Sequence, residues 1–353
     1  MTDVLPRIVG LATARPPQDV HPAFIDWAEQ RIEQPRERAL FRRMAGRAGI
    51  AHRFAVLPPT ADGGSPVDPG GFYAGDDPST AARMALYAEH APALALAAIG
   101  RLSFDPQSIT HLVVASCTGF VAPGVDQIIA RRLGLVPSVE RLLVGFMGCY
   151  AAVTALRSAA HIVRSTPQAR VLVVTVELSS LHLNRTGNLE SLLAMLQFGD
   201  GAAAALVQAD GVGLSVEAPF ATTLPESDTL IRWDIGDNGF LMHLSGEVPG
   251  RIAEALRDPA LVATLAGGAP ADVDAWAVHA GGRSILDAVE HGLSLTPDAL
   301  ADSRAVLHEG GNMSSSTLMF VLERMMGRPV TRGVALAFGP GLAAEGFRFR
   351  SVA

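Results

Sequence analysis

Three residues far apart in the chain have types and settings suited to nucleophilic chemistry. The first, Cys149, lies in GFMGCYAAVTALR, between a strand-like run with glycines and a stretch that favours a helix. A thiol at a helix N-terminus is stabilised as thiolate by the helix dipole and by free backbone N–H groups. Most cysteines are instead small buried hydrophobic residues, so the glycine-flanked setting is what makes Cys149 a candidate nucleophile.

A histidine and an asparagine complete this set. His279 ends a predicted strand at 274–279 and is followed by an alanine and two glycines. Active sites in α/β proteins open at the carboxyl ends of strands, although capping or interface roles are commoner among the ten histidines of this chain. Asn312 lies in HEGGNMSSS at the predicted start of a helix, where an ordinary N-cap is the alternative role.

A constant spacing links the candidates. Cys149 and Asn312 are 163 residues apart, and each is predicted to follow a strand and to begin a helix. For Asn312 the strand-like segment is 305–308. The same offset relates two pairs of predicted strands: 111–116 with 274–279, and 171–177 with 334–340.

We therefore predict an internal duplication, with an N-terminal half at 1–215 that carries Cys149 and a C-terminal half at 216–353 that carries His279 and Asn312. If the halves pack about a pseudo-twofold axis, the three side chains converge. Such a set supports acyl transfer, because a thiolate can hold an acyl group as a thioester. Imidazole and carboxamide can hydrogen-bond the developing oxyanion, and one such donor is worth roughly 2.7–4 kcal/mol.

The elements that must position these residues indicate an α/β protein. Short apolar runs bounded by turn residues predict buried parallel strands, with helices at 150–164 and 314–326. This alternation predicts an α/β sandwich. The segment 57–79, rich in Pro, Gly and Asp, predicts a long surface loop. The predicted strands are 111–116, 141–146, 170–177, 274–279 and 333–341.

Composition excludes several classes of chemistry. The 353 residues include 28 basic side chains, all of them arginine, and 35 acidic ones, giving a net charge of −7. Without lysine there is no Schiff-base lysine, no pyridoxal phosphate anchor and no P-loop lysine. The acidic balance argues against nonspecific nucleic-acid binding, and two cysteines are too few for a disulfide scaffold. With no signal peptide and no apolar run of about 18 residues, we expect a cytoplasmic protein.

Several motifs, in this order and spacing, point to one family. GCYAAVTALR (148–157), HAGGRSIL (279–286) and GNMSSSTLMFVL (311–322) resemble the nucleophile, histidine and asparagine motifs of the type III polyketide synthases, which belong to the thiolase superfamily and are related to plant chalcone synthase. The resemblance covers most of the chain and implies a five-layered αβαβα fold of two duplicated halves, usually in a homodimer. Other matching segments are GLATARPP (10–17), HLVVASCTGFVAPGVD (111–126), FGDGAAA (198–204) and AFGPGL (337–342).

The resemblance implies a role for each matching residue. Cys149 would be the nucleophile, and His279 and Asn312 the donors for decarboxylation and for the oxyanion. Phe198 would be the gate between a coenzyme A tunnel and the reaction chamber. Basic residues at the tunnel mouth fall on Arg43 and Arg47, for which a solvated helix face is the alternative explanation.

The chain also departs from the plant pattern. The third basic position falls on Leu40, with Arg42 as the candidate to offset its loss. Ala280 and Ala122 replace a proline and a methionine. The segment 233–250 resembles bacterial members that make alkylpyrones and alkylresorcinols from fatty acyl starters. The positions implied to line the acyl cavity are Cys117, Ser179, His182, Trp233, Met242 and Ser314.

We therefore expect an iterative acyltransferase that loads a fatty acyl-CoA starter onto Cys149 and condenses it with malonyl-CoA to a pyrone or resorcinol. Because the chain is carried on coenzyme A, no carrier domain is required. No metal or cofactor is expected beyond the coenzyme A thioesters, and the expected partners are these thioesters and a second copy of the chain. A β-ketoacyl-[acyl-carrier-protein] synthase III with a single condensation is one alternative. A cysteine-dependent thioester hydrolase and a non-catalytic dimer subunit are the others.

Overall fold

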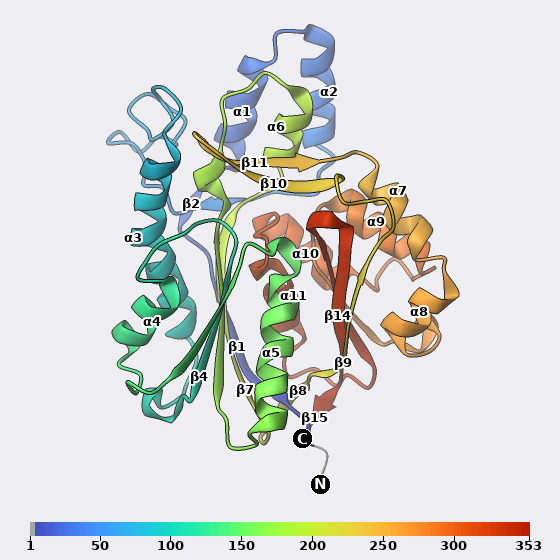
Figure 1. The fold of residues 1–353 in the computed structure, drawn as a ribbon. Helices are drawn as coiled ribbons and strands as arrows, with labels where there is room; N and C mark the ends of the chain where they lie inside the picture. The colour runs from blue at the N-terminus through green and yellow to red at the C-terminus, as the bar shows by residue number, and fades with distance from the viewer. Residues whose placement is uncertain (1–3) are drawn as a thin grey trace.

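The part of the chain that the computed structural model describes, residues 4–353, is built around two mixed β-sheets (Figure 1). The larger sheet contains β1 (Arg7–Ala14), β4 (His111–Ser116), β5 (Glu140–Gly145), β6 (Val171–Leu178), β7 (Asp200–Gln208), β8 (Gly213–Ser215) and β15 (Ser351–Val352). Its spatial order is β15–β8–β1–β7–β6–β4–β5, so β5 forms one edge.

The smaller sheet repeats part of this pattern. It contains β9 (Glu217–Thr223), β12 (Ala275–Val278), β13 (Gly333–Gly339) and β14 (Ala343–Phe349), in the order β12–β13–β14–β9. In the larger sheet, the parallel pair β4–β6 is followed by the antiparallel neighbours β7 and β1. In the smaller sheet, the parallel pair β12–β13 is followed by the antiparallel neighbours β14 and β9. The shared pattern agrees with the predicted duplication.

Helices form the remaining three layers (Figure 1). The central helices α5 (Ala151–Ser165) and α11 (Ser316–Met325) lie between the sheets, and their buried side chains share one core with both. On the outer side of the larger sheet lie α3 (Thr80–Ile99) and α4 (Val125–Leu133). The smaller sheet is covered by α7 (Val248–Ala255), α8 (Pro259–Ala266), α9 (Arg283–Gly292) and α10 (Ala301–Gly310).

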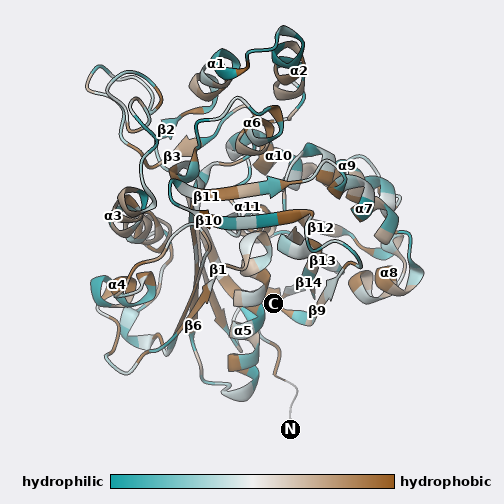
Figure 2. Ribbon diagram, turned by 45° about the horizontal axis from the view of Figure 1, so that its top comes forward, coloured by the Kyte–Doolittle hydropathy of each residue, from teal (hydrophilic) through white to brown (hydrophobic). Residues whose placement is uncertain are grey.

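Alternation along the strands explains why both faces of each sheet are covered. In β4, Val113 and Ala115 belong to the central core, whereas Leu112 and Val114 pack in the outer core with α3. Because successive side chains of a strand point to opposite faces, a continuously apolar strand requires a partner layer on each side. Figure 2 accordingly shows hydrophobic residues along the strands and hydrophilic residues on the outer turns of helices such as α4.

A third group of elements lies across one end of the sheets (Figure 1). It contains β2 (Gln18–Asp19), α1 (His21–Arg31), α2 (Pro35–Ala45), β3 (Phe54–Ala55), α6 (Leu189–Met195) and the hairpin β10 (Ile231–Gly236)–β11 (Gly239–Leu244). Phe24, Trp27 and Phe41 form a small core there with α6. We call this group the cap. Single turns of 3-10 helix complete the chain: η1 (Pro106–Ser108), η2 (Gly148–Tyr150), η3 (Ser179–His182), η4 (Pro270–Asp272) and η5 (Pro340–Leu342).

The five predicted strands are present, within one or two residues at each end, and so are both predicted helices. The prediction of a strand at 305–308 is wrong, because these residues lie inside α10. An apolar run as short as 305–307 does not distinguish a strand from a helix, and here the run continues a helical pattern that begins at Ala301. The segment 57–79 is irregular as predicted, yet Leu57 and Tyr73 within it are buried. In residues 4–353, no helix has the length and apolarity to cross a membrane.

Candidate active site

Cys149 lies at the turn that joins β5 to α5. The turn η2 carries it, and Gly148 just before it has a φ of 76°. A Cβ atom at Gly148 would lie 2.4 Å from Cδ of Pro340, so both the backbone conformation and the space require glycine here. The glycine therefore lets η2 pack directly on η5, and this contact fixes the cysteine at the end of the strand as the sequence predicted.

A small cavity of about 20 Å³ lies at this cysteine. Every residue predicted for the gate and acyl cavity lines it, with the exception of His182. Its walls come from both halves of the chain and from the cap hairpin. The lining residues are Cys117, Thr118, Gly148, Cys149, Ser179, Phe198, Ile231, Trp233, Met242, Ser314 and Pro340.

A larger cavity of about 420 Å³ adjoins it, and we call this the side chamber. The two cavities share Ser179, Phe198, Trp233 and Met242, so the chamber begins where the cysteine cavity ends. Its walls are formed by α1, α6, the cap hairpin and the irregular segment 57–79. Apolar side chains dominate these walls: Val20, Phe24, Ala55, Leu57, Pro66, Val67, Leu183, Met195, Phe240 and Leu241.

His182 lines the side chamber as a structural group. Its Nε2 donates to the carbonyl of Thr118 at 2.7 Å, and its Nδ1 accepts from the amide of Phe240 at 3.1 Å. These two bonds require the neutral tautomer with the proton on Nε2. Burial lowers the pKa of His182 to about 3, which agrees with that state. Nearby, the indole of Trp233 donates to the carbonyl of Cys117 at 3.1 Å and is held across the cavity.

Asn312 connects the cysteine with two other parts of the site. A hydrogen bond from its side chain favours the charged form of Cys149. Its Nδ2 also donates to the carbonyl of Gly281 at 3.1 Å, and its Oδ1 accepts from the amide of Ser314 at 2.8 Å. The backbone of Asn312 forms a parallel bridge with Phe198. The predicted gate and the predicted amide donor are therefore joined through the main chain.

His279 follows β12 and is 1% exposed. Its ring packs against Gly281, where a Cβ atom would lie 3.4 Å from Nε2. Neither ring nitrogen has a hydrogen-bond partner among the described residues. Burial lowers the pKa of His279 to about 3, so the imidazole is neutral at physiological pH. The structure thus joins Cys149 to Asn312, and Asn312 to the turn that holds His279.

Burial works against the thiolate that the helix start was expected to favour. It raises the pKa of the Cys149 thiol to about 12, while hydrogen bonds with Ser314 and Asn312 act in the opposite direction. The expectation of a lowered pKa for the thiol alone is therefore wrong. In a site that excludes water, a lone negative charge loses its hydration, and a fraction of helix dipole does not replace it.

Sequence analysis missed a buried carboxylate beneath the cavity. Glu177 is fully buried and accepts hydrogen bonds from the amide of Cys117 at 3.0 Å and from the hydroxyls of Thr118 and Ser315. The thiol of Cys117 lies 3.4 Å from both carboxylate oxygens and 3.2 Å from the hydroxyl of Ser314. Burial raises the pKa values of both Glu177 and Cys117. A lone acidic residue in the apolar run VLVVTVEL was a signal for this network.

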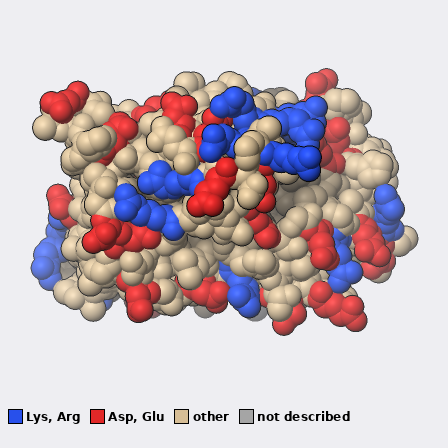
Figure 3. Space-filling view, turned by 90° about the horizontal axis from the view of Figure 1, so that it is seen from above, with Lys and Arg blue, Asp and Glu red and all other residues tan. Residues whose placement is uncertain are grey.

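A wide groove of about 1330 Å³ lies on the cap. Leu40, Arg43 and Arg47, the positions that the resemblance assigns to the tunnel mouth, line it together with Gly281 beside the histidine. Arg42 does not replace the missing basic residue, because it forms an ion pair with Glu29. Instead Arg283, which the sequence analysis did not select, lines the groove and donates to the carbonyl of Arg47 at 3.2 Å. Figure 3 shows arginines gathered on this end of the molecule.

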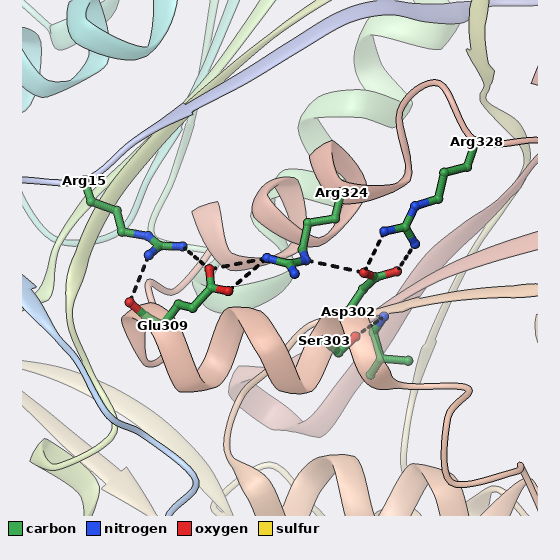
Figure 4. Close-up of polar contacts among 7 residues, drawn as sticks. Arg15, Asp302, Ser303, Glu309, Arg324 and Arg328 are labelled. Carbon is green, nitrogen blue, oxygen red and sulfur yellow. Dashed lines mark hydrogen bonds and ion pairs between the residues drawn. The ribbon is translucent and has the colours of Figure 1, made fainter.

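Helix α10 links the segment that ends in His279 with the segment that carries Asn312, and ion pairs hold it in place (Figure 4). Near its start, Ser303 accepts a hydrogen bond from the amide of Val278, the neighbour of His279. Arg324 on α11 binds both Asp302 and Glu309, which lie at the two ends of α10. The helix ends at Gly310, two residues before Asn312. Because α10 contacts the segment of His279 and leads into Asn312, the position of this helix determines the positions of both residues.

Comparison with known proteins identifies the class that this fold and site define. The family model for the N-terminal domain of chalcone and stilbene synthases matches residues 29–211, and the model for the C-terminal domain matches residues 215–353. The chain therefore belongs to the chalcone and stilbene synthase family and is a type III polyketide synthase. Enzymes of this family condense acyl-CoA units, and their substrates are malonyl-CoA and acyl-CoA.

Individual relatives agree with this assignment. The chain is 36% identical over 285 residues to the alpha-pyrone synthesis polyketide synthase-like Pks18 of Mycobacterium tuberculosis and Mycobacterium bovis, covering 76% of this chain and 72% of that protein. It superposes on all of PKS-I from the brown alga Ectocarpus siliculosus with a TM-score of 0.87, at 30% identity and full coverage of this chain.

A second solved structure is similar over the same extent. The C-terminal type III polyketide synthase domain of Steely1 from Dictyostelium gives a TM-score of 0.88 at 26% identity, covering 99% of this chain and 100% of that domain. The predicted thiolase-like fold, the enzyme class and the family are thus confirmed.

Proposed function

We propose that this enzyme extends fatty acyl-CoA starters with malonyl-CoA and releases the product as a pyrone or a resorcinol. The observation that supports this most directly is the side chamber, whose apolar walls adjoin the cysteine cavity at four shared residues. Transfer of an alkyl chain on Cys149 from water into such a chamber is favourable by about 0.8 kcal/mol per buried methylene. The name of the mycobacterial relative, which refers to alpha-pyrone synthesis, supports the same product class.

In the proposed loading step, the sulfur of Cys149 attacks the thioester carbonyl of the starter. The neutral imidazole of His279 accepts the thiol proton, and this proton then passes to the departing coenzyme A sulfur. A C–S bond forms on Cys149 as the C–S bond to coenzyme A breaks. His279 suits this role because burial keeps its ring neutral and no described residue occupies its nitrogens.

In the proposed condensation step, malonyl-CoA loses carbon dioxide and leaves an enolate. The N–H groups of His279 and Asn312 hydrogen-bond the enolate oxygen, as an oxyanion hole does. The enolate carbon attacks the thioester on Cys149, a C–C bond forms, and the cysteine sulfur departs. Coenzyme A then carries the lengthened chain back to Cys149 for another round. Phe198 lies where the cysteine cavity meets the side chamber.

We propose that the groove on the cap binds coenzyme A through Arg43 and Arg47. Guanidinium groups bind phosphate oxygens through paired hydrogen bonds, so two of them can hold the diphosphate of the carrier. The turn at Gly281 lines the same groove and also receives the hydrogen bond of Asn312. This places the end of the pantetheine arm beside the two proposed donors. We also propose a cytoplasmic location.

We propose a homodimer that forms along β5. This strand is the edge of the larger sheet, and Leu142 and Leu143 on it are 43% and 48% exposed. The nearby Phe120 is 50% exposed. An open strand edge with exposed apolar side chains favours pairing with another strand, and a twofold axis would bring two copies of β5 together.

The test is product analysis with purified enzyme, radiolabelled malonyl-CoA and a series of acyl-CoAs, with the acyl-CoAs radiolabelled instead in the trapping experiment. Wild-type enzyme should give labelled pyrones or resorcinols, and Cys149→Ala should give no polyketide and trap no labelled acyl group. His279→Ala and Asn312→Ala should release carbon dioxide from malonyl-CoA more slowly, whereas His291→Ala, a histidine at the end of α9, should not. Full product formation by Cys149→Ala would refute the scheme.

The same assay distinguishes the alternatives. A β-ketoacyl synthase would stop after one condensation and require an acyl carrier protein. A thioester hydrolase would release coenzyme A and free acid without forming a carbon–carbon bond. The comparisons with known proteins do not favour either one.

A further inference from the structure

The side chamber contains one charged group that an alkyl chain does not need. Arg53, which follows the loop after α2, lines the chamber and is 4% exposed. Its Nε donates to Nδ1 of His21 at 2.8 Å, and its Nη1 donates to the carbonyls of Met195 at 3.1 Å and Phe198 at 2.7 Å. Its Nη2 has no hydrogen-bond partner among the described residues.

Among residues 4–353, no carboxylate accepts a hydrogen bond from this guanidinium. The nearest acids, Asp19 and Asp200, attract it, but their oxygens accept hydrogen bonds from other groups. Burial lowers the pKa of Arg53 to about 9, so the group is still charged at physiological pH. A buried charge with an unused N–H group is unfavourable unless another group binds there. Because Arg53 also lines the chamber, its unused N–H group can serve a ligand that carries an oxygen acceptor.

The position of Arg53 shows which part of a ligand it would meet. The guanidinium stacks over the ring of Phe24, a chamber residue, at 4.5 Å. Its Nη1 holds the backbone of Phe198, whose side chain lines both the chamber and the cysteine cavity. A chain attached to Cys149 that enters the chamber passes Phe198, and Arg53 lies behind the backbone of this residue in the chamber lining.

We propose that Nη2 of Arg53 hydrogen-bonds an oxygen on the acyl chain in the side chamber. This inference rests on the proposed function, because it requires the chain to occupy the chamber. The oxygen has two possible sources, a ketone that the enzyme makes during extension or a substituent that the starter carries. In either case the enzyme binds an oxygenated chain more tightly than a hydrocarbon chain of equal length, since a hydrogen bond to a charged donor is added.

The test measures affinity with chains that differ only in their oxygen. The Cys149→Ala protein, which cannot be acylated at this position, is titrated with octanoyl-CoA, β-ketooctanoyl-CoA and ω-hydroxyoctanoyl-CoA by calorimetry. We expect at least one oxygenated thioester to bind about tenfold more tightly than octanoyl-CoA. Tighter binding of the β-keto compound would indicate that Arg53 binds a ketone made by the enzyme. Tighter binding of the ω-hydroxy compound would indicate that it binds an oxygen carried by the starter.

A second set of proteins assigns this preference to Arg53. Arg53→Met, added to Cys149→Ala, should reduce the preference to about one, and Arg53→Lys should retain part of it because the charge remains. Arg38→Met is the matched control, since Arg38 also donates to a backbone carbonyl in the cap but lies outside the chamber lining. It should leave the preference unchanged.

Two results would overturn the inference. One is equal affinity for all three thioesters in the Cys149→Ala protein, a measurement that needs no change at Arg53 and so is independent of any folding defect there. The other is an unchanged preference in Arg53→Met. Failure of the proposed function is distinguishable, because wild-type enzyme would then make no polyketide from octanoyl-CoA and malonyl-CoA.

Discussion

Removing His279 should change the pH at which Cys149 reacts. Burial raises the pKa of the thiol to about 12 and lowers the pKa of the imidazole to about 3. Each pKa shift reflects the cost of one unpaired charge, a thiolate on Cys149 or an imidazolium on His279, in a site without water. When a proton moves from the sulfur to the imidazole, two opposite charges form together and stabilise each other. In His279→Gln this partner is lost, and the sulfur must ionise alone.

The size of the change in reactivity follows from the pKa of the Cys149 thiol. A pKa raised from 9.0 to about 12 corresponds to about a thousandfold less thiolate at neutral pH, or roughly 4 kcal/mol. Because a raised thiol pKa leaves the reactive form only at high pH, alkylation of His279→Gln should rise about tenfold per pH unit up to about pH 11. Wild-type enzyme should react faster at neutral pH and reach its plateau at lower pH.

The assay is alkylation by iodoacetamide at a series of pH values, followed by mass spectrometry of the peptide that contains Cys149. Peptide mapping is needed because Cys117 is also a free thiol. The control is His291→Gln, which removes a histidine outside the site and should follow the wild-type curve. Identical curves for wild-type enzyme and His279→Gln would show that His279 does not accept the thiol proton.

Three further predictions concern the surroundings of the site. Arg43→Gln together with Arg47→Gln should raise the KM for acyl-CoA several-fold with little change in kcat, as steady-state kinetics would show; an unchanged KM would remove these arginines from the carrier site. Leu143→Asp on the edge strand should shift the enzyme from dimer toward monomer in sedimentation, and an unaltered mass would place the interface elsewhere. Arg324→Met should lower kcat for carbon dioxide release from malonyl-CoA a few-fold without raising KM, because α10 would lose the one side chain that binds both of its ends, although Arg328 still binds Asp302 and Arg15 still binds Glu309. Arg324→Lys should recover part of the loss, and equal kcat in all three proteins would contradict a positioning role.

Much of the fold and the setting of Cys149 were predictable because they depend on local patterns, whereas the gate, cavity and coenzyme A positions were assigned from the resemblance to a family. Buried strands appear in the sequence as short apolar runs. The offset of 163 residues identified β12 as the equivalent of β4, and β13 as the equivalent of β6. The position of Cys149 between a strand and a helix depends on Gly148, whose positive φ requires glycine and so leaves a signal in the sequence itself. The strand expected at 305–308 failed for a related reason, since helix and strand share the same short apolar signal.

The features that were not predictable depend on contacts between distant segments. Burial reverses the expected effect of the helix start on Cys149, and no local pattern gives the extent of burial. Arg283 reaches the groove because α9 begins beside α2, and Arg53 reaches the chamber because β3 packs near α6. Glu177 has a sequence signal, but its partners Cys117 and Ser315 come from different halves of the chain.

The hairpin β10–β11 belongs to neither of the two main sheets, since its strands pair only with each other in residues 4–353. It nevertheless supplies Trp233 and Met242 to both cavities. Natural variation can thus rewrite this hairpin, and with it the substrate range, while the layered interior stays intact. For enzyme engineering, exchanging this hairpin among relatives offers a route to new products, provided that its contacts with Thr80, Cys117 and His182 are kept.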